Sequence, residues 1–311
     1  MKNVLITGVN GFVGPYLVEH LKQFDYQLFG MGYKPSSSLD DALSDMEMFW
    51  GDIRETEFIN STLNTVQPDA IIHLAGQSSV ALSFKDPDLT FSINVAGTRC
   101  LLNGAKLLKK PVRVVLVSSS EVYGIPKNLP VQETHPTDPI SPYGESRVQQ
   151  EALCAEFPEL SIVIARSFNH IGPKQPADRV CSSFAKQIIE IEKGLKPGLL
   201  KVGNLDVLRD FSDVRDIVDA YARLLTLDCK SGEVFNLCSG RAIEIRSVLD
   251  KFLAFVDQKI EVQIDPDRLR PSNIPKLYGS YDKLKAATGW EPKLALESTL
   301  ENILNYWRDV L

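Results

Sequence analysis

Residues 8–14 read Gly8-Val9-Asn10-Gly11-Phe12-Val13-Gly14, and they directly follow a short apolar run at residues 4–6. Beyond them, Phe12, Tyr16, Leu17 and Leu21 recur at the three-to-four spacing of one helix face. Glycine permits a tight turn between a strand and a helix, and it lets backbone amides approach a pyrophosphate. The stretch therefore predicts a dinucleotide-binding turn whose contacts come from Gly8, Asn10, Gly11, Phe12, Val13 and Gly14.

The first half of the chain alternates β-rich runs with amphipathic stretches. The strand candidates are residues 4–6, 27–31, 48–50, 70–74, 112–117 and 161–165. A second, longer helix is marked by Phe91, Val95, Leu101, Leu102 and Leu107. Strands that alternate with helices in this way predict an α/β fold with a Rossmann-like, doubly wound parallel sheet.

The second half is less regular, because prolines separate short helices and strands after residue 166. We expect residues 1–165 to form the dinucleotide-binding domain, with about 205–240 returning to it. Residues 166–311 are expected to form a smaller, mixed α/β substrate-binding region. The last helix is clear, since one apolar face carries Leu296, Leu300, Ile303, Leu304 and Trp307, which we expect to pack in the core.

Composition excludes several classes of protein. No apolar run among the 311 residues approaches the roughly 18 to 20 residues of a membrane span, and the N-terminal run is too short for a signal peptide. A net charge of −6 speaks against nucleic-acid binding. The five cysteines form no CxxC pair and the four histidines no metal-ligand spacing. These features predict a cytoplasmic enzyme with reduced thiols and without a metal ion.

The region after the second strand candidate bears on the choice of cofactor. The acidic residue that would bind the adenosine ribose 2′-hydroxyl of NAD is missing there, and Tyr33-Lys34-Pro35-Ser36-Ser37 stands in its place. Lys34 with serine hydroxyls could neutralise a 2′-phosphate, so the sequence favours NADP(H), with NAD(H) as the alternative.

The next strand candidate is followed by a second cofactor contact. Asp52 and Ile53 have the placement of a pair at the adenine edge. Asp52 could equally cap the start of a helix.

Three residues form a candidate catalytic group. Ser119 stands at the carboxyl end of the 112–117 strand, where doubly wound sheets bind ligands. Tyr143 and Arg147 are four residues apart, so on a helix both side chains reach the same face. A tyrosine hydroxyl, with a reference pKa of ~10, protonates a carbonyl well only beside a cation. The group predicts a site that polarises a ketone for hydride transfer.

Arg147 stands where a Tyr-x-x-x-Lys pair would have lysine. A guanidinium keeps its charge at every relevant pH, but its planar fork is larger than an ammonium group. The positive field on Tyr143 should therefore remain, while contacts to the cofactor ribose are altered. We expect slower turnover or a more weakly held cofactor than with lysine.

Taken together, these residues resemble the extended short-chain dehydrogenase/reductase family over essentially the whole chain. Four segments are general to that family, at residues 8–14, 73–80, 94–98 and 141–144. The resemblance implies that Leu74, Ala75, Gly76 and Asn94 also contact the cofactor and that Ser79 contacts the substrate. More selective segments lie at residues 166–173, 202–206, 209–216 and 269–275, and they are similar to the branch that acts on GDP-hexoses, closest to the GDP-6-deoxy-D-mannose reductases.

The resemblance implies reduction of GDP-4-keto-6-deoxy-D-mannose to GDP-D-rhamnose with NAD(P)H, in a homodimer whose contact uses the helices around 91–108 and 143–156. A GDP-sugar carries negative phosphates, which cationic side chains bind. The expected substrate contacts are Asn169, Lys186, Arg209 and Arg270, with the guanine held by the backbone of Leu200, Lys201 and Val202.

Two other readings stay open. Glu121 stands where the dehydratases of this branch place a base, so a GDP-mannose 4,6-dehydratase or a related epimerase is an alternative. Because Arg147 replaces the catalytic lysine, a catalytically impaired protein that binds NADP and a GDP-sugar is a further alternative. Asn273 also departs from the branch, which usually has an acid there to contact the guanosine ribose.

Overall fold

A parallel sheet of seven strands forms the larger part of the molecule. The computed structural model describes residues 2–35, 40–269 and 274–311. The strand order is β11-β6-β5-β4-β1-β2-β3, with every neighbouring pair parallel. The strands are β1 (Lys2–Thr7), β2 (Tyr26–Gly32), β3 (Glu47–Trp50), β4 (Ala70–His73), β5 (Arg113–Ser119), β6 (Ser161–Ser167) and β11 (Glu233–Leu237). This order confirms the predicted doubly wound, Rossmann-like α/β fold.

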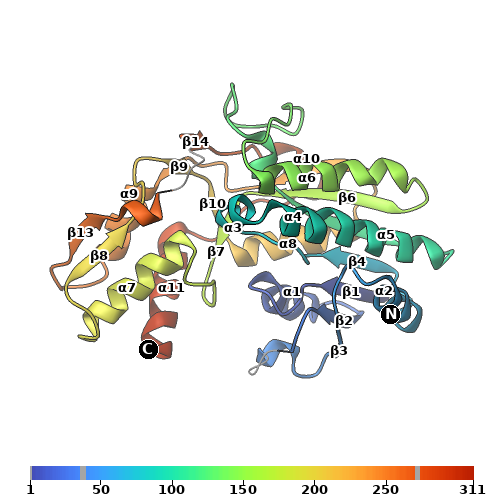
Figure 1. The fold of residues 1–311 in the computed structure, drawn as a ribbon, viewed down its shortest axis with the longest axis horizontal. Coiled ribbons are helices and arrows are strands. Elements are labelled where there is room, and N and C mark those ends of the chain that lie inside the picture. The colour runs from blue at the N-terminus through green and yellow to red at the C-terminus, as the bar shows by residue number, and fades with distance from the viewer. Residues whose placement is uncertain (1, 36–39, 270–273) are drawn as a thin grey trace.

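Helices cover both faces of this sheet (Figure 1). One face packs against α1 (Val13–Leu21), α8 (Val214–Thr226) and α10 (Asp282–Thr288). The other packs against α2 (Thr56–Val66), α5 (Gly97–Leu107) and the short helix η4 (Leu153–Glu156) that follows α6 (Pro142–Ala152). Both faces are apolar because a parallel sheet is buried on its two sides. We call this assembly the sheet lobe.

A second, smaller body lies beside the sheet and contains the C-terminus (Figure 1). Its core joins α7 (Val180–Glu192), α9 (Ile245–Leu253), α11 (Leu296–Val310) and β8 (Leu199–Val202), which pairs with β13 (Glu261–Ile264). The expected face of the last helix is confirmed, since Leu300, Ile303, Leu304 and Trp307 are buried there and Leu296 packs against them. We call this body the C-terminal lobe.

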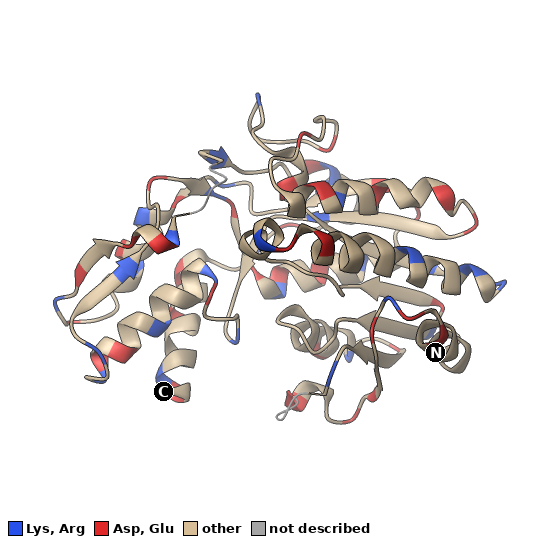
Figure 2. Ribbon diagram, in the orientation of Figure 1, with Lys and Arg blue, Asp and Glu red and all other residues tan. Residues whose placement is uncertain are grey.

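Short elements connect the two lobes. The strands are β7 (Asn169–Ile171), which pairs with β10 (Phe211–Asp213), and β9 (Leu208–Arg209), which lies between β12 (Ile243–Glu244) and β14 (Lys276–Leu277). The remaining helices are η1 (Asp41–Leu43), α3 (Val80–Lys85), α4 (Pro87–Phe91), η2 (Ser92–Ala96), η3 (Ser120–Tyr123) and η5 (Pro266–Arg268). Cationic and anionic residues are scattered over both lobes (Figure 2). Among the described residues, no helix has the length and hydropathy of a membrane span.

The predicted strands match the structure more closely than the predicted helices. All six strand candidates fall on β1 to β6, with ends that differ by at most two residues. The long helix expected around 91–107 is interrupted by η2, a π-helix at Ser92–Ala96. The division of the chain at residue 165 stays a prediction, and the pairing of β11 with β6 supports the expected return of residues near 240 to the sheet.

A buried histidine joins the central strands to a covering helix. His73, at the end of β4, has its Nδ1 2.7 Å from Thr7 Oγ1 at the end of β1 and its Nε2 2.8 Å from Thr98 Oγ1 in α5. Desolvation of the ring, and secondly the positive charge of Arg147, lower the pKa of His73 to about 3. His73 is therefore neutral in the folded protein at any pH above that value.

The low pKa of His73 predicts a specific acid sensitivity. An unfolded histidine binds a proton below pH ~6.5, whereas folded His73 does not until about pH 3, so stability falls as the pH drops through this window. Between pH 7 and pH 5, this group alone should cost about 2 kcal/mol of unfolding free energy. Denaturant unfolding of the parent and of His73→Asn at both pH values checks this. The variant should lack that part of the loss, and an equal loss in both proteins would contradict the assignment.

Candidate active site

One cavity of about 1570 Å³ opens along the carboxyl ends of the sheet strands. Residues that end or directly follow β1, β2, β3, β4, β5 and β6 line it, and residues of the C-terminal lobe close its other side. Single-ligand pockets usually measure about 300 to 1,000 Å³. The cavity is therefore large enough for two ligands, one against each lobe.

The glycine turn between β1 and α1 forms one wall. Gly8 has a φ of +68°, and a Cβ there would lie 2.7 Å from Ala75 N. Gly8, Asn10, Gly11, Phe12 and Val13 line the cavity as predicted cofactor contacts, but Gly14 does not. A Cβ at Gly14 would collide with the carbonyl oxygen of Val9, so this glycine serves the close packing of helix against strand.

The ends of β2 and β3 form the far part of this wall. Tyr33, Asp52 and Ile53 line the cavity, whereas Lys34 does not. The Lys34 ammonium instead lies 5.0 Å from the centre of the Tyr33 ring, and its carbonyl oxygen accepts a hydrogen bond from Asn10 Nδ2. Of the residues expected to accompany it, Ser36 and Ser37 lie outside the described residues.

Asp52 is already engaged by a neighbour that the sequence reasoning missed. Arg54 donates to both carboxylate oxygens of Asp52, from Nε at 2.9 Å and from Nη2 at 2.5 Å, and it also lines the cavity. This pairing lowers the pKa of the Asp52 carboxyl. Asp52 is not a helix cap, because α2 is preceded by Glu55 at its N-cap.

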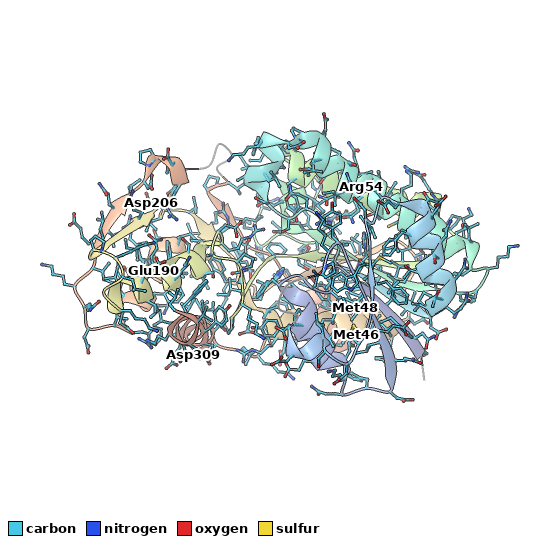
Figure 3. The ribbon with its side chains drawn as sticks, turned by 60° about the horizontal axis from the view of Figure 1, so that its bottom comes forward. Met46, Met48, Arg54, Glu190, Asp206 and Asp309 are labelled. Carbon is cyan, nitrogen blue, oxygen red and sulfur yellow. The ribbon has the colours of Figure 1, made fainter. Side chains whose placement is uncertain are left out.

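Figure 3 shows Arg54 on the sheet lobe and Glu190 and Asp206 in the C-terminal lobe.

The loop after β4 contributes Leu74, Ala75 and Gly76 to the cavity, but the prediction for Asn94 needs correction. Asn94 is fully buried and does not line the cavity. Its Oδ1 accepts from Gln77 N at 2.8 Å, and its Nδ2 donates to Gln77 O and to Ser146 Oγ. Asn94 thus ties the loop to α6, and any effect on a cofactor is indirect.

The three predicted catalytic residues lie on the same wall of the cavity. Ser119 ends β5, and its Oγ accepts a hydrogen bond from Glu121 N at 3.2 Å, which leaves its own proton free to donate. Tyr143 and Arg147 lie one turn apart on α6, which begins at Pro142 behind the Ser141 cap. The Arg147 guanidinium carbon is 5.2 Å from the centre of the Tyr143 ring.

The protein provides hydrogen-bond acceptors for only some of the Arg147 guanidinium donors. Its Nη1 donates to Gln150 Oε1 at 2.7 Å and to Val117 O at 3.2 Å, and the side chain is 5% exposed. Its Nε is buried with no hydrogen-bond partner in the described part of the chain. Its Nη2 lies so close to Gly76 that a Cβ there would be 2.8 Å away. Because Nε has no accessible surface, Nη2 is the donor that a dinucleotide could reach beside Gly76, and a ribose or phosphate oxygen could serve as its acceptor.

The predicted substrate contacts divide into three groups: residues that line the cavity, residues that do not, and residues outside the described part of the chain. Glu121, Asn169, Val202 and Arg209 line the cavity. Ser79 does not, since its Oγ accepts from Leu82 N and caps α3. Arg270 and Asn273 lie outside the described residues.

Three further predicted contacts lie off the cavity for identifiable reasons. Lys186 has its ammonium 3.7 Å from Glu190 and 5.5 Å from the centre of the Trp307 ring, within the C-terminal lobe. Leu200 is fully buried in the core of that lobe. The backbone N–H and C=O of Lys201 bond the Gln187 side chain, so they are not available to a guanine.

Two arginines of the C-terminal lobe occupy the cavity wall instead. Arg179 donates to Ser78 Oγ at 2.9 Å, and Arg268 donates to Ser183 Oγ at 3.1 Å; all four residues line the cavity. Neither stands within the segments that the resemblance made selective, so the sequence offered little signal for them. Gln150 was also missed, although its place three residues after Arg147 puts it on the same helix side.

Comparisons with known proteins agree with this geometry. The family model for GDP-mannose 4,6-dehydratase matches residues 5–303. The chain is 34% identical to the GDP-6-deoxy-D-mannose reductase of Pseudomonas aeruginosa over 98% of this chain and 97% of that protein. It is 26% identical to human GDP-mannose 4,6-dehydratase over 97% of this chain and 90% of that one.

Solved structures of sugar-nucleotide enzymes also resemble this chain. The structure of RMD from Pseudomonas aeruginosa, complexed with NADPH, superposes with a TM-score of 0.87 at 32% identity, over 100% of both chains. The UDP-glucose 4-epimerase of Thermus thermophilus, in complex with NAD, gives a TM-score of 0.88 at 26% identity, over 99% of this chain and 100% of that one. With its family model matched over nearly its whole length, the chain belongs to the GDP-mannose 4,6-dehydratase family, a group of extended short-chain dehydrogenases/reductases.

Proposed function

We propose that this protein reduces the 4-keto group of GDP-4-keto-6-deoxy-D-mannose to give GDP-D-rhamnose, with NADPH as the reductant. The observation that carries the proposal is the placement of Ser119, Tyr143 and Arg147 on one wall of a cavity with room for two ligands. Similarity to a GDP-6-deoxy-D-mannose reductase over nearly all of both chains supports the substrate, and an RMD structure complexed with NADPH supports the cofactor.

The residues divide the chemistry between them. When bound, reduced nicotinamide supplies a hydride to C4 of the sugar. Tyr143 gives the proton that the ketone oxygen needs to become a hydroxyl, so that hydride and proton together complete the reduction. Ser119 Oγ accepts a hydrogen bond from Glu121 N. Its hydroxyl hydrogen is therefore oriented away from that bond and donates to the same ketone oxygen. Arg147 keeps a positive charge beside Tyr143 throughout.

The dehydratase reading keeps one specific observation in its favour. Glu121 lines the cavity close to Ser119, which is where a base for proton removal from the sugar would act. A dehydratase or epimerase returns its hydride and consumes no cofactor overall. Net oxidation of NADPH therefore separates the reductase from this alternative, and binding without turnover would select an impaired binding protein.

The site assignments and the assembly belong to the same proposal. We propose that Asn169, Arg209, Arg179 and Arg268 contact the GDP-sugar, since all four line the cavity. A homodimer would use the helices around 91–108 and 143–156, where Leu107 is 62% exposed. We also propose a cytoplasmic location, in keeping with five free cysteines.

The principal test is a reaction with the GDP keto sugar. The parent protein should oxidise one NADPH for each sugar reduced, and NMR of the product should show the D-rhamnose configuration. Tyr143→Phe removes the proton donor and should lower kcat by about 100-fold or more. Tyr306→Phe, a change on α11 of the C-terminal lobe, serves as the matched control and should not affect kcat. Product formation without NADPH oxidation would refute the reductase assignment.

The cofactor preference gives a second prediction. Lys34 does not line the cavity, but its ammonium lies 5.0 Å from the ring of Tyr33, which lines the end that we expect to receive the adenosine ribose. Lys34→Ala should raise the KM for NADPH about tenfold, because a charge-assisted bond to the 2′-phosphate is lost, and leave the KM for NADH unchanged. Steady-state kinetics with both cofactors measures this, with Lys109→Ala as the control at a distant surface lysine. A similar rise for both cofactors would rule out 2′-phosphate recognition by Lys34.

A further inference from the structure

We propose that Gln150 is a positioning residue for Arg147, and that the two side chains act as one unit toward the cofactor. This inference rests on the proposed function for the cofactor class, NADP(H), but not for the sugar. Gln150 is fully buried on α6, three residues after Arg147, and it does not line the cavity. It therefore reaches a ligand only through the arginine.

The hydrogen bonds fix the orientation of the Gln150 amide without ambiguity. Its Oε1 accepts from Arg147 Nη1 at 2.7 Å, which is the only workable pairing because a guanidinium cannot accept. Its Nε2 donates to Thr98 Oγ1 at 2.8 Å, and the Thr98 hydroxyl in turn donates a hydrogen bond to Asn94 O at 2.7 Å. A flipped amide would place donors against donors on the arginine side.

The same chain of bonds continues to the central strands. The Thr98 hydroxyl hydrogen is engaged by Asn94 O, so Thr98 Oγ1 accepts a hydrogen bond from His73 Nε2. His73 Nδ1 then accepts from Thr7 Oγ1, which requires the neutral imidazole that its low pKa provides. The guanidinium is thus tied, through four buried side chains, to the ends of β4 and β1, where the cofactor turn begins.

This anchoring decides which donors of Arg147 remain for a ligand. Nη1 is used by Gln150 and Val117 O, and Nε is buried with no hydrogen-bond partner among the described residues. Nη2, which lies against Gly76 of the cavity lining, is therefore the donor that faces a ligand. Because a guanidinium is planar and rigid, fixing Nη1 also fixes the directions of the other two nitrogens. A lysine ammonium, which turns freely on a flexible stem, would not need such a support.

A double-mutant cycle tests the unit. The proteins are the parent, Gln150→Met, Arg147→Lys and the double variant, since methionine has the length of glutamine without its acceptor. In the parent background, Gln150→Met should weaken NADPH binding about tenfold and lower kcat about tenfold, with the KM for the GDP-sugar within about twofold. In the Arg147→Lys background, the same change should alter both quantities less than about twofold.

Binding is measured by NADPH fluorescence with no sugar present, and the melting temperature of each cofactor-free protein is recorded beside it. A general packing role for Gln150 would lower NADPH affinity equally in both backgrounds, and that result would overturn the proposal. An unchanged affinity in the parent background would overturn it as well. If the parent fails to reduce the keto sugar, the proposed function fails, while the binding cycle still decides the role of Gln150.

Discussion

The site depends on the permanent positive charge of Arg147, which lines the cavity and is almost completely buried. A buried cation is costly unless neighbouring groups supply acceptors or a counter-charge. Among the described residues no carboxylate forms an ion pair with Arg147; it receives a side-chain amide and a backbone carbonyl instead. The positive charge lies beside the Tyr143 ring. It is also the second cause, after desolvation, of the low pKa of His73.

The neighbouring turn of the same helix handles a second buried cation in the opposite way. Arg166 on β6 donates to both carboxylate oxygens of Glu151, at 2.9 and 2.6 Å, and Ser118 donates to the first of them. The guanidinium also lies 4.8 Å from the centre of the Tyr123 ring. The paired charges of Arg166 and Glu151 offset each other and fasten α6 to β5 and β6, while Arg166 Nη1 is buried without a hydrogen-bond partner among the described residues. Two consecutive residues of α6 thus have different roles. Gln150 orients the uncompensated charge of Arg147 at the cavity, and Glu151 neutralises the charge of Arg166.

Sequence reasoning succeeded where local pattern and fold agree. The apolar strands and the glycine turn specify the sheet, because parallel strands buried on both faces leave a strong signal and only glycine fits the turn at Gly8. Ser119, Tyr143 and Arg147 could be grouped because strand order and helix spacing bring them together. Asn94 was assigned from a resembling segment alone, and in the structure it bonds the loop rather than facing the cavity.

The C-terminal lobe shows why charge alone misleads in the substrate region. On α7, Lys186 forms an ion pair with Glu190 and lies over the Trp307 ring. Gln187 hydrogen-bonds the backbone of Lys201, so both side chains stabilise the C-terminal lobe itself. Arg179 stands at the N-cap of the same helix, and Arg268 lies beside its first turn through Ser183, so these two face the cavity. Arg179 precedes the first residue of α7 and Arg268 belongs to η5, so the cations that line the cavity lie beside the N-terminal end of the helix and not along its length. The placement of this end depends on the packing of α7 against α11 and β8 in the core of the lobe, which no local motif encodes.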